Sequence, residues 1–268
     1  MKILILGGTT EASALAAALA ERSIPALFSY AGRVQAPKPQ PLPTRIGGFG
    51  GGAGLAAYLT EQRITHLVDA THPFAEQMSR NAVTAASHSG IPLIALTRSP
   101  WVPQAGDRWE PVASVEAAVS ALAGPPQRIL LAIGRQQLAA FAAQPQHHYL
   151  LRLIEAPETP PPLPRHHLIL DRGPFTLDGD LALLREHGIQ RVVCKNAGGT
   201  GAIAKLDAAR RLGVPVVMLE RPVSPPRREV HSVDAVLAWL HHDLAPESDS
   251  EPDPDSGPES DTRAERGV

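Results

Sequence analysis

Hydrophobic positions along the chain form short continuous runs that alternate with longer stretches in which apolar residues recur every three or four positions. The short runs predict strands buried on both faces, and the longer stretches predict amphipathic helices. Alternation of the two is typical of β-α units built around a parallel sheet. The predicted strands are 3–6, 26–29, 67–70, 93–96, 129–133, 150–154, 168–170, 192–194 and 216–219. The predicted helices are 11–22, 55–62, 75–89, 115–122, 137–143, 180–187, 202–212 and 233–241.

Proline and glycine interrupt this alternation at three places. Residues 35–43 contain four prolines and residues 156–164 contain five, so both segments are predicted to be irregular loops. Gly124-Pro125-Pro126 separates two sets of β-α units and is the predicted domain boundary. The sequence therefore predicts an α/β protein with two Rossmann-like domains, residues 1–124 and residues 125–246. Each domain is expected to contain a parallel sheet, with a ligand cleft between the two.

The C-terminal end has a different composition. Residues 247–268 contain eight carboxylates, two arginines and almost no apolar side chain, so burial cannot offset the entropy of ordering them. We predict a disordered acidic tail, which is either a dispensable extension or an interaction arm. The net charge of the whole chain is −2, so the remainder is slightly positive. This charge is too diffuse for nucleic acid, and it suits an anionic small molecule.

Composition also indicates the compartment. No apolar run approaches the roughly 20 residues that a membrane helix needs, and no basic segment with a cleavable apolar core begins the chain. Cys194 is the single cysteine, which excludes internal disulfides and multi-cysteine metal sites. We expect a cytoplasmic protein with no metal and no membrane partner.

The first candidate site is the turn after the first predicted strand, formed by Gly7, Gly8, Thr9 and Thr10. A glycine turn that leads into a helix lets backbone N–H groups approach a pyrophosphate. The turn is not a full dinucleotide fingerprint, because the outer glycine positions are Leu6 and Ala12. It predicts cofactor binding, and the alternative is a plain strand-to-helix turn.

The end of the second predicted strand bears on which cofactor is bound. NAD enzymes usually place an acidic residue there, whereas NADP enzymes place arginine and small polar residues near the 2′-phosphate. No acidic residue occurs between Glu21 and Glu61, while Ser29 ends this strand and Arg33 follows it. The window favours NADPH and NADP+, with Ser29 and Arg33 as cofactor-binding residues; the alternative for Arg33 is a solvated loop charge.

A glycine-rich loop follows, with six glycines among residues 47–54. Glycines permit unusual backbone angles and close approach of a ligand. A flexible linker of this kind would usually contain serine and no aromatic residue, so the loop is predicted to face the cofactor through Gly47, Gly48 and Phe49.

Polar residues also follow the strand predicted at 67–70. Thr71 and His72 lie where the carboxyl end of that strand should face the ligand. Both are candidate cofactor contacts, and His72 is also the candidate catalytic residue. The alternative is that His72 only caps the turn before the next helix.

The second half of the chain contributes candidate substrate contacts. Arg172 follows one predicted strand, and Lys195 ends another and precedes Asn196, Gly198 and Gly199. Lysine is rare here, with four lysines against 21 arginines, so its place at a strand end favours a role for Lys195. Arg172 and Lys195 are predicted to bind carboxylates or phosphates, and the amide and glycines to add neutral donors. The alternative for each is solvated surface.

Several of these segments together resemble the precorrin-6A reductases of cobalamin biosynthesis. The segments are Ile5-Leu-Gly-Gly-Thr-Thr-Glu-Ala12, Asp69-Ala-Thr-His-Pro-Phe-Ala75, Lys195-Asn-Ala-Gly-Gly199, Lys205-Leu-Asp-Ala-Ala-Arg210, Val216-Val-Met218 and Arg221-Pro222. The likeness runs from about residue 2 to residue 240 and omits the acidic tail. One departure is Ala197, where many members have serine, so no catalytic hydroxyl is assigned there.

This resemblance implies two Rossmann-like domains with cofactor and tetrapyrrole between them. It implies hydride delivery from NADPH to a double bond of precorrin-6A, an anionic tetrapyrrole, giving precorrin-6B, and handover to neighbouring enzymes of the pathway. Relatives in the anaerobic route act on the cobalt-containing macrocycle. Two other classes stay open: a non-catalytic NADP-binding sensor, and a nucleotide-sugar transferase. His72 is the best candidate proton donor, and solvent is its rival.

Overall fold

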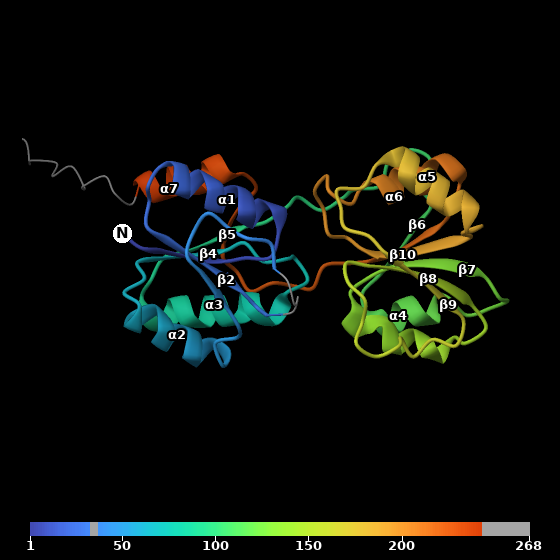
Figure 1. Ribbon diagram of the computed structural model, residues 1–268, viewed down its shortest axis with the longest axis horizontal. Coiled ribbons are helices and arrows are strands. Elements are labelled where there is room, and N and C mark those ends of the chain that lie inside the picture. The colour runs from blue at the N-terminus through green and yellow to red at the C-terminus, as the bar shows by residue number, and fades with distance from the viewer. Residues whose placement is uncertain (33–36, 243–268) are drawn as a thin grey trace, which may run out of the picture.

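The computed structural model describes residues 1–32 and 37–242. It contains two parallel six-stranded sheets that lie next to each other along the long axis of the molecule (Figure 1). Helices cover both faces of each sheet. The predicted α/β class with two Rossmann-like domains is confirmed.

The first sheet has the strand order β12-β5-β4-β1-β2-β3. Its strands are β1 (Ile3–Leu6), β2 (Ala26–Tyr30), β3 (Thr44–Ile46), β4 (His66–Asp69), β5 (Leu93–Leu96) and β12 (Arg228–Val230). Helices α1 (Thr10–Glu21) and α7 (Val233–His242) cover one face, and α2 (Gly51–Glu61) and α3 (Glu76–Ser89) cover the other (Figure 1). Side chains of β1 alternate between the faces: Ile3 and Ile5 pack under α1 and α7, whereas Leu4 and Leu6 pack under α2 and α3.

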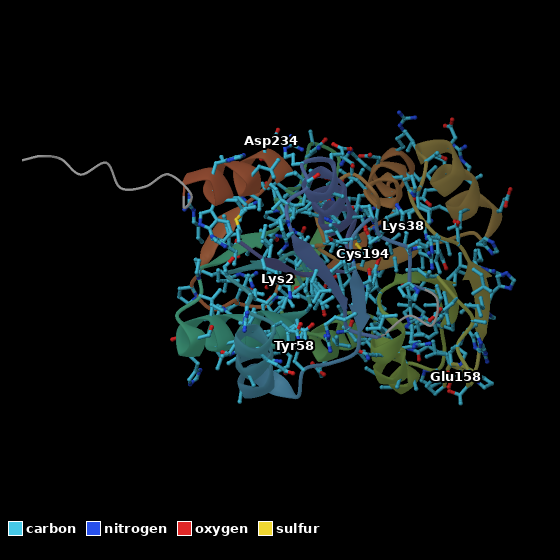
Figure 2. All side chains as sticks on the ribbon, turned by 60° about the vertical axis from the view of Figure 1, so that its left-hand side comes forward. Lys2, Lys38, Tyr58, Glu158, Cys194 and Asp234 are labelled. Atoms are coloured by element: carbon cyan, nitrogen blue, oxygen red, sulfur yellow. The ribbon has the colours of Figure 1, made fainter. Side chains whose placement is uncertain are left out.

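The second sheet has the strand order β6-β11-β10-β7-β8-β9. Its strands are β6 (Trp109–Val112), β7 (Arg128–Ala132), β8 (His148–Leu153), β9 (His166–Leu170), β10 (Arg191–Lys195) and β11 (Val216–Leu219). The helices are α4 (Val115–Ser120), the 3₁₀ helix η1 (Arg135–Ala143), α5 (Leu177–Glu186) and α6 (Ala204–Leu212). Cys194, labelled in Figure 2, is buried in β10, and its Sγ packs 3.8 Å from Met218 Sδ.

The predicted boundary at residue 124 does not follow the sheets and is corrected by their topology. After β5 the chain crosses to the second sheet through residues 97–108, and β6 pairs with β11 there. After β11 it returns through residues 220–227, and β12 pairs with β5 of the first sheet. The chain therefore crosses between the sheets twice. A single division at residue 124 assigns β6 to the first domain and β12 to the second, whereas β6 belongs to the second sheet and β12 to the first. The return also places α7 against α1 in the first domain (Figure 1).

Three strands were not predicted, and all three lie at sheet edges: β3, β6 and β12. An edge strand has one paired side and is only partly buried, so its sequence lacks a continuous apolar run. The segment predicted as a helix at 137–143 is the 3₁₀ helix η1. Residues 37–43 and 156–164 are irregular, as the prolines predict. Within the described ranges, no helix is long and apolar enough to cross a membrane. Arg33 and the predicted tail, 247–268, lie outside the described residues.

Candidate functional site

The candidate residues of both domains lie at the junction between the two sheets. In each sheet they follow the carboxyl ends of the strands, which is where ligands bind in open parallel sheets. The two edges meet at Lys195, the last residue of β10, whose Nζ lies 5.0 Å from the ring centroid of Phe74 in the loop after β4. The geometry therefore brings together residues that are more than a hundred positions apart in the sequence.

The turn after β1 is built for close approach. A Cβ at Gly7 would lie 2.1 Å from the Phe28 ring, so only glycine fits there. Gly8 has φ +124, and a Cβ added to it would meet no protein atom within 4 Å. Thr9 caps α1 by accepting a hydrogen bond from the Ala12 N–H, and its hydroxyl donates to the Ala70 carbonyl. The turn is thereby fixed to β4 while its glycine backbone stays open on one side.

Arg45 orders the glycine-rich loop after β3. Its Nη1 donates to Ser29 Oγ at 2.9 Å and to the Gly47 carbonyl at 2.8 Å, and its Nη2 donates to the Gly48 carbonyl at 3.0 Å. The guanidinium also lies 3.9 Å from the centroid of the Phe49 ring, a cation–π contact. Of the predicted cofactor residues, Ser29, Gly47, Gly48 and Phe49 are therefore gathered by one arginine, which the sequence analysis did not select.

Buried Asp69 shapes the loop that carries His72. One carboxylate oxygen accepts hydrogen bonds from the N–H and the hydroxyl of Thr71, and the other accepts one from the Ser79 hydroxyl. The second oxygen also pairs with the guanidinium of Arg227, which is 7% exposed and comes from the return crossing. Thr71 is therefore turned toward Asp69, and its role in cofactor binding stays a prediction.

His72 has its proton position fixed by the backbone. Its Nδ1 accepts a hydrogen bond from the Phe74 N–H, and because an amide can only donate, the neutral ring carries its proton on Nε2. Burial, followed by the nearby charges of Arg98, Lys195 and Arg221, lowers the pKa of His72 to about 4. At neutral pH the ring is a hydrogen-bond donor through Nε2, and its protonated form is scarce.

Lys195 and Arg172 do not form a contacting pair. Lys195 ends β10, whereas exposed Arg172 follows β9, and two strands lie between them in the sheet order. Three strand spacings correspond to roughly 14 Å. The two cations lie at one edge of the sheet, far enough apart to reach different groups of a large ligand.

The residues after Lys195 have partners that the sequence analysis did not predict. The side-chain amide of Asn196 accepts from the Trp101 N–H at 2.8 Å and donates to the Trp101 carbonyl at 3.0 Å. A Cβ at Gly198 would lie 2.2 Å from the Ser99 carbonyl oxygen, and a Cβ at Gly199 would lie 2.8 Å from the Arg98 side chain. These residues contact residues 97–108, the outward crossing from the first sheet to the second. Their predicted contacts with substrate stay untested.

Sequence reasoning missed four residues of the site: Arg45, Arg98, Trp101 and Arg221. Arg98 and Trp101 lie in the outward crossing, and Arg221 lies in the return crossing. Neither crossing has the periodic apolar residues from which a helix or strand, and hence its position in the fold, could be predicted. The available signal was Arg221-Pro222, which belongs to the family resemblance but suggested no role.

The geometry of the first domain fits a dinucleotide. Gly8, Gly48, Gly50 and Gly51 have no protein atom within 4 Å of an added Cβ, so both glycine turns present open backbone at the carboxyl edge of the sheet. Two surface hollows of about 290 Å³ each lie in the second domain, away from these turns. One lies at the amino ends of β7 to β9 and the other beside the 157–162 loop, so neither is the candidate site.

Fold and site together define a class: a protein of two Rossmann-like domains whose binding loops meet at a cation-rich junction. The sequence profile described as "Precorrin-6x reductase CbiJ/CobK" matches residues 2–241. The chain belongs to this family of precorrin-6x reductases.

Individual relatives agree with this assignment. The chain is 56% identical over 239 residues to a protein named "Precorrin-6A reductase" from Rhodobacter capsulatus, covering 89% of this chain and 95% of that protein. It is 30% identical over 175 residues to a "Cobalt-precorrin-6A reductase" from Priestia megaterium, covering 62% of this chain and 68% of that protein. A solved structure named "CobK precorrin-6A reductase" superposes with a TM-score of 0.87 at 56% identity, covering 90% of this chain and 96% of that one.

Proposed function

We propose that this protein is a precorrin-6A reductase that uses NADPH to reduce a double bond of the macrocycle, giving precorrin-6B in cobalamin biosynthesis. The observation that carries the proposal is the position of His72. It lies in the loop after β4, where the Ala70 carbonyl accepts a hydrogen bond from Thr9 of the first glycine turn and Phe74 contacts Lys195 of the second domain. The charges of Arg98, Lys195 and Arg221 act on its ring. A neutral donor among three cations is suited to a bound anion.

The first domain is assigned the cofactor. When bound, NADPH would supply a hydride, and the protein would supply its orientation. Gly7 and Gly8 would lie against the pyrophosphate at the start of α1, and the loop ordered by Arg45 would lie against the adenosine end. Arg33 is proposed to contact the 2′-phosphate.

The second domain is assigned the tetrapyrrole. Lys195 and Arg172 would bind separate carboxylates of the macrocycle, because they lie at one sheet edge without touching. His72 would donate a hydrogen bond through Nε2. Its low pKa leaves little imidazolium at neutral pH, so water is the simpler source of the proton that completes the reduction. Identity is higher to the relative named for precorrin-6A than to the one named for the cobalt form, which favours the metal-free substrate.

The test is to incubate the purified protein anaerobically with NADPH and precorrin-6A. Oxidation of NADPH is monitored as the loss of the absorbance of the reduced nicotinamide. Cobalt-precorrin-6A and NADH are tested in parallel. The proposal expects turnover with NADPH and precorrin-6A. Tight NADPH binding with no oxidation of either macrocycle would instead indicate a sensor, and preference for the cobalt form would place the protein in the anaerobic route.

A matched pair of variants tests the substrate assignment. Lys195→Ala should raise the KM for the tetrapyrrole, with NADPH affinity changed by less than about threefold, because a carboxylate contact binds ground state and transition state alike. Lys2→Ala is the control, since Lys2 lies at the amino end of β1 and donates to the Gln62 carbonyl. The Lys195 effect should shrink as salt approaches roughly 0.5 M, where charges are screened. Loss of NADPH binding with an unchanged tetrapyrrole KM would reassign Lys195 to the cofactor.

A further inference from the structure

The two crossings between the domains pass close to each other at the candidate site. The outward crossing is held by the first domain at Arg98, whose Nε donates to Glu11 of α1 at 2.7 Å. Three residues later it is held by the second domain at Trp101, whose indole N–H donates to the Gly199 carbonyl at 2.8 Å. The change of partner therefore occurs within residues 98–101, and we call this short segment the hinge.

Arg221, at the start of the return crossing, spans this hinge. Its Nη1 donates to the Arg98 carbonyl at 2.7 Å, on the first-domain side. Its Nε donates to the Asn196 carbonyl at 2.9 Å and its Nη2 to the Ala197 carbonyl at 3.1 Å, on the second-domain side. One guanidinium thus joins both crossings and the loop after β10.

Neighbouring residues are shaped around these contacts. A Cβ at Gly198 would lie 2.5 Å from Arg221 Nη2, so glycine is required for the guanidinium to enter. The Asn196 side chain holds Trp101 through two hydrogen bonds while its carbonyl accepts from Arg221. Each of the three carbonyls is contacted by a different nitrogen of the planar fork. Lysine has three N–H donors but only one nitrogen, so it cannot place donors at all three positions.

We propose that Arg221 is a positioning residue that fixes the angle between the two domains. This inference rests on the proposed function, in which the first domain holds the nicotinamide and the second holds the acceptor carbon. The hinge then sets the distance across which the hydride moves. A misplacement of about 1 Å at the reacting atoms can cost roughly a hundredfold in rate, so a loosened hinge should slow hydride transfer more than it weakens binding of either ligand.

The kinetic test uses Arg221→Lys, which keeps the charge near His72 and removes the fork. We expect kcat to fall about ten- to a hundredfold, with both KM values changed by less than about threefold. The isotope effect on kcat, measured with NADPH deuterated at either face of the nicotinamide C4, should rise as hydride transfer becomes more limiting. Arg210→Lys is the matched control: Arg210 on α6 makes comparable bonds to Asp207 and to Asp107, which lies at the second-domain end of the outward crossing, six residues beyond the hinge. It should leave kcat and the isotope effect unchanged.

A second measurement is independent of activity. Cys194 is buried, so single cysteines introduced by Thr60→Cys on α2 and Glu186→Cys on α5, both at exposed positions, can carry a pair of spin labels. The distance distribution between the labels should broaden in Arg221→Lys and stay narrow in Arg210→Lys. If Arg221→Lys does not fold, Asn196→Asp, which keeps the acceptor for the Trp101 N–H and loses the donor, should broaden it as well.

The outcomes separate the two proposals. An unchanged distance distribution and an unchanged kcat in Arg221→Lys would overturn the positioning role. A raised tetrapyrrole KM with an unchanged kcat would overturn it too, and would make Arg221 a substrate contact. Absence of NADPH oxidation by the wild-type protein would overturn the proposed function, while the label distances would still decide whether Arg221 fixes the domain angle.

Discussion

Replacing Arg227 by methionine should destabilise the first domain far more than an ordinary surface substitution. Arg227 and Asp69 form an ion pair in which the side chains are 7% and 1% exposed. Removing one partner of a buried pair costs about 3–5 kcal/mol, because the remaining charge is left without compensation. Asp69 keeps three hydrogen bonds from Thr71 and Ser79, which places the expected loss near the lower end, at about 3 kcal/mol. For a chain of this size the melting temperature should fall by roughly 6–12 °C.

The assay is thermal and urea unfolding of Arg227→Met, with hydrogen exchange of the loop after β4 as a local readout. Arg80→Met is the control, because Arg80 pairs with Glu76 on the exposed side of α3, where side chains are 55% and 41% exposed. Such a surface pair contributes about 0.3–0.5 kcal/mol. In a double-mutant cycle, Asp69→Asn should lose much of its effect once Arg227 is absent. A loss below about 1 kcal/mol in Arg227→Met, or a cycle without coupling, would refute the reasoning.

Three further predictions follow from the same junction and from the tail. The His72 ring should titrate near pH 4 by NMR. Its contribution to the free energy of unfolding should therefore be complete above about pH 6.5 and be lost as the pH falls toward 4, and a titration near 6.5 would contradict this. Gly198→Ala should lower the unfolding free energy by roughly 2–4 kcal/mol, because φ is +68 and the new Cβ would collide with the Ser99 carbonyl. Gly213→Ala, with φ +67 and open space, should cost only roughly 1–2 kcal/mol, and equal losses by calorimetry would show that the collision is unimportant. A chain ending at Ala245 should keep its melting temperature and turnover, because the family profile matches residues 2–241; loss of either would assign the tail a role.

The turns predicted to bind the cofactor were accessible to sequence reasoning because they are local. Gly7 and Gly8 follow a buried strand directly, and the backbone conformation that such a turn needs is written in the glycines themselves. Lys195 was accessible for the same reason, as a charged residue that ends an apolar run. In each case the strand, the turn and the residues predicted to bind a ligand lie within a few positions of one another.

The roles of Asn196, Gly198 and Gly199 could not be predicted in this way. All three lie in a loop that looks like a ligand site, and the structure shows that they contact the outward crossing. Their partners lie about a hundred residues earlier in the chain, in a segment with no periodic pattern. A glycine that admits a ligand and a glycine that admits another part of the chain are identical in sequence.

The sequence by itself determined the two parallel sheets and their buried strands, because a strand covered on both faces must be continuously apolar whatever its neighbours are. Tertiary structure decided where the domains divide. The short edge strands β6 and β12 are only partly buried, so their own sequences do not determine which sheet they join. That depends on which sheet has an unpaired edge close to them in space. The same is true of the junction: Arg221 and Arg227 acquire their partners Arg98 and Asp69 only when the chain has crossed twice, because hydrogen bonds and ion pairs depend on distance in space and not on separation in sequence.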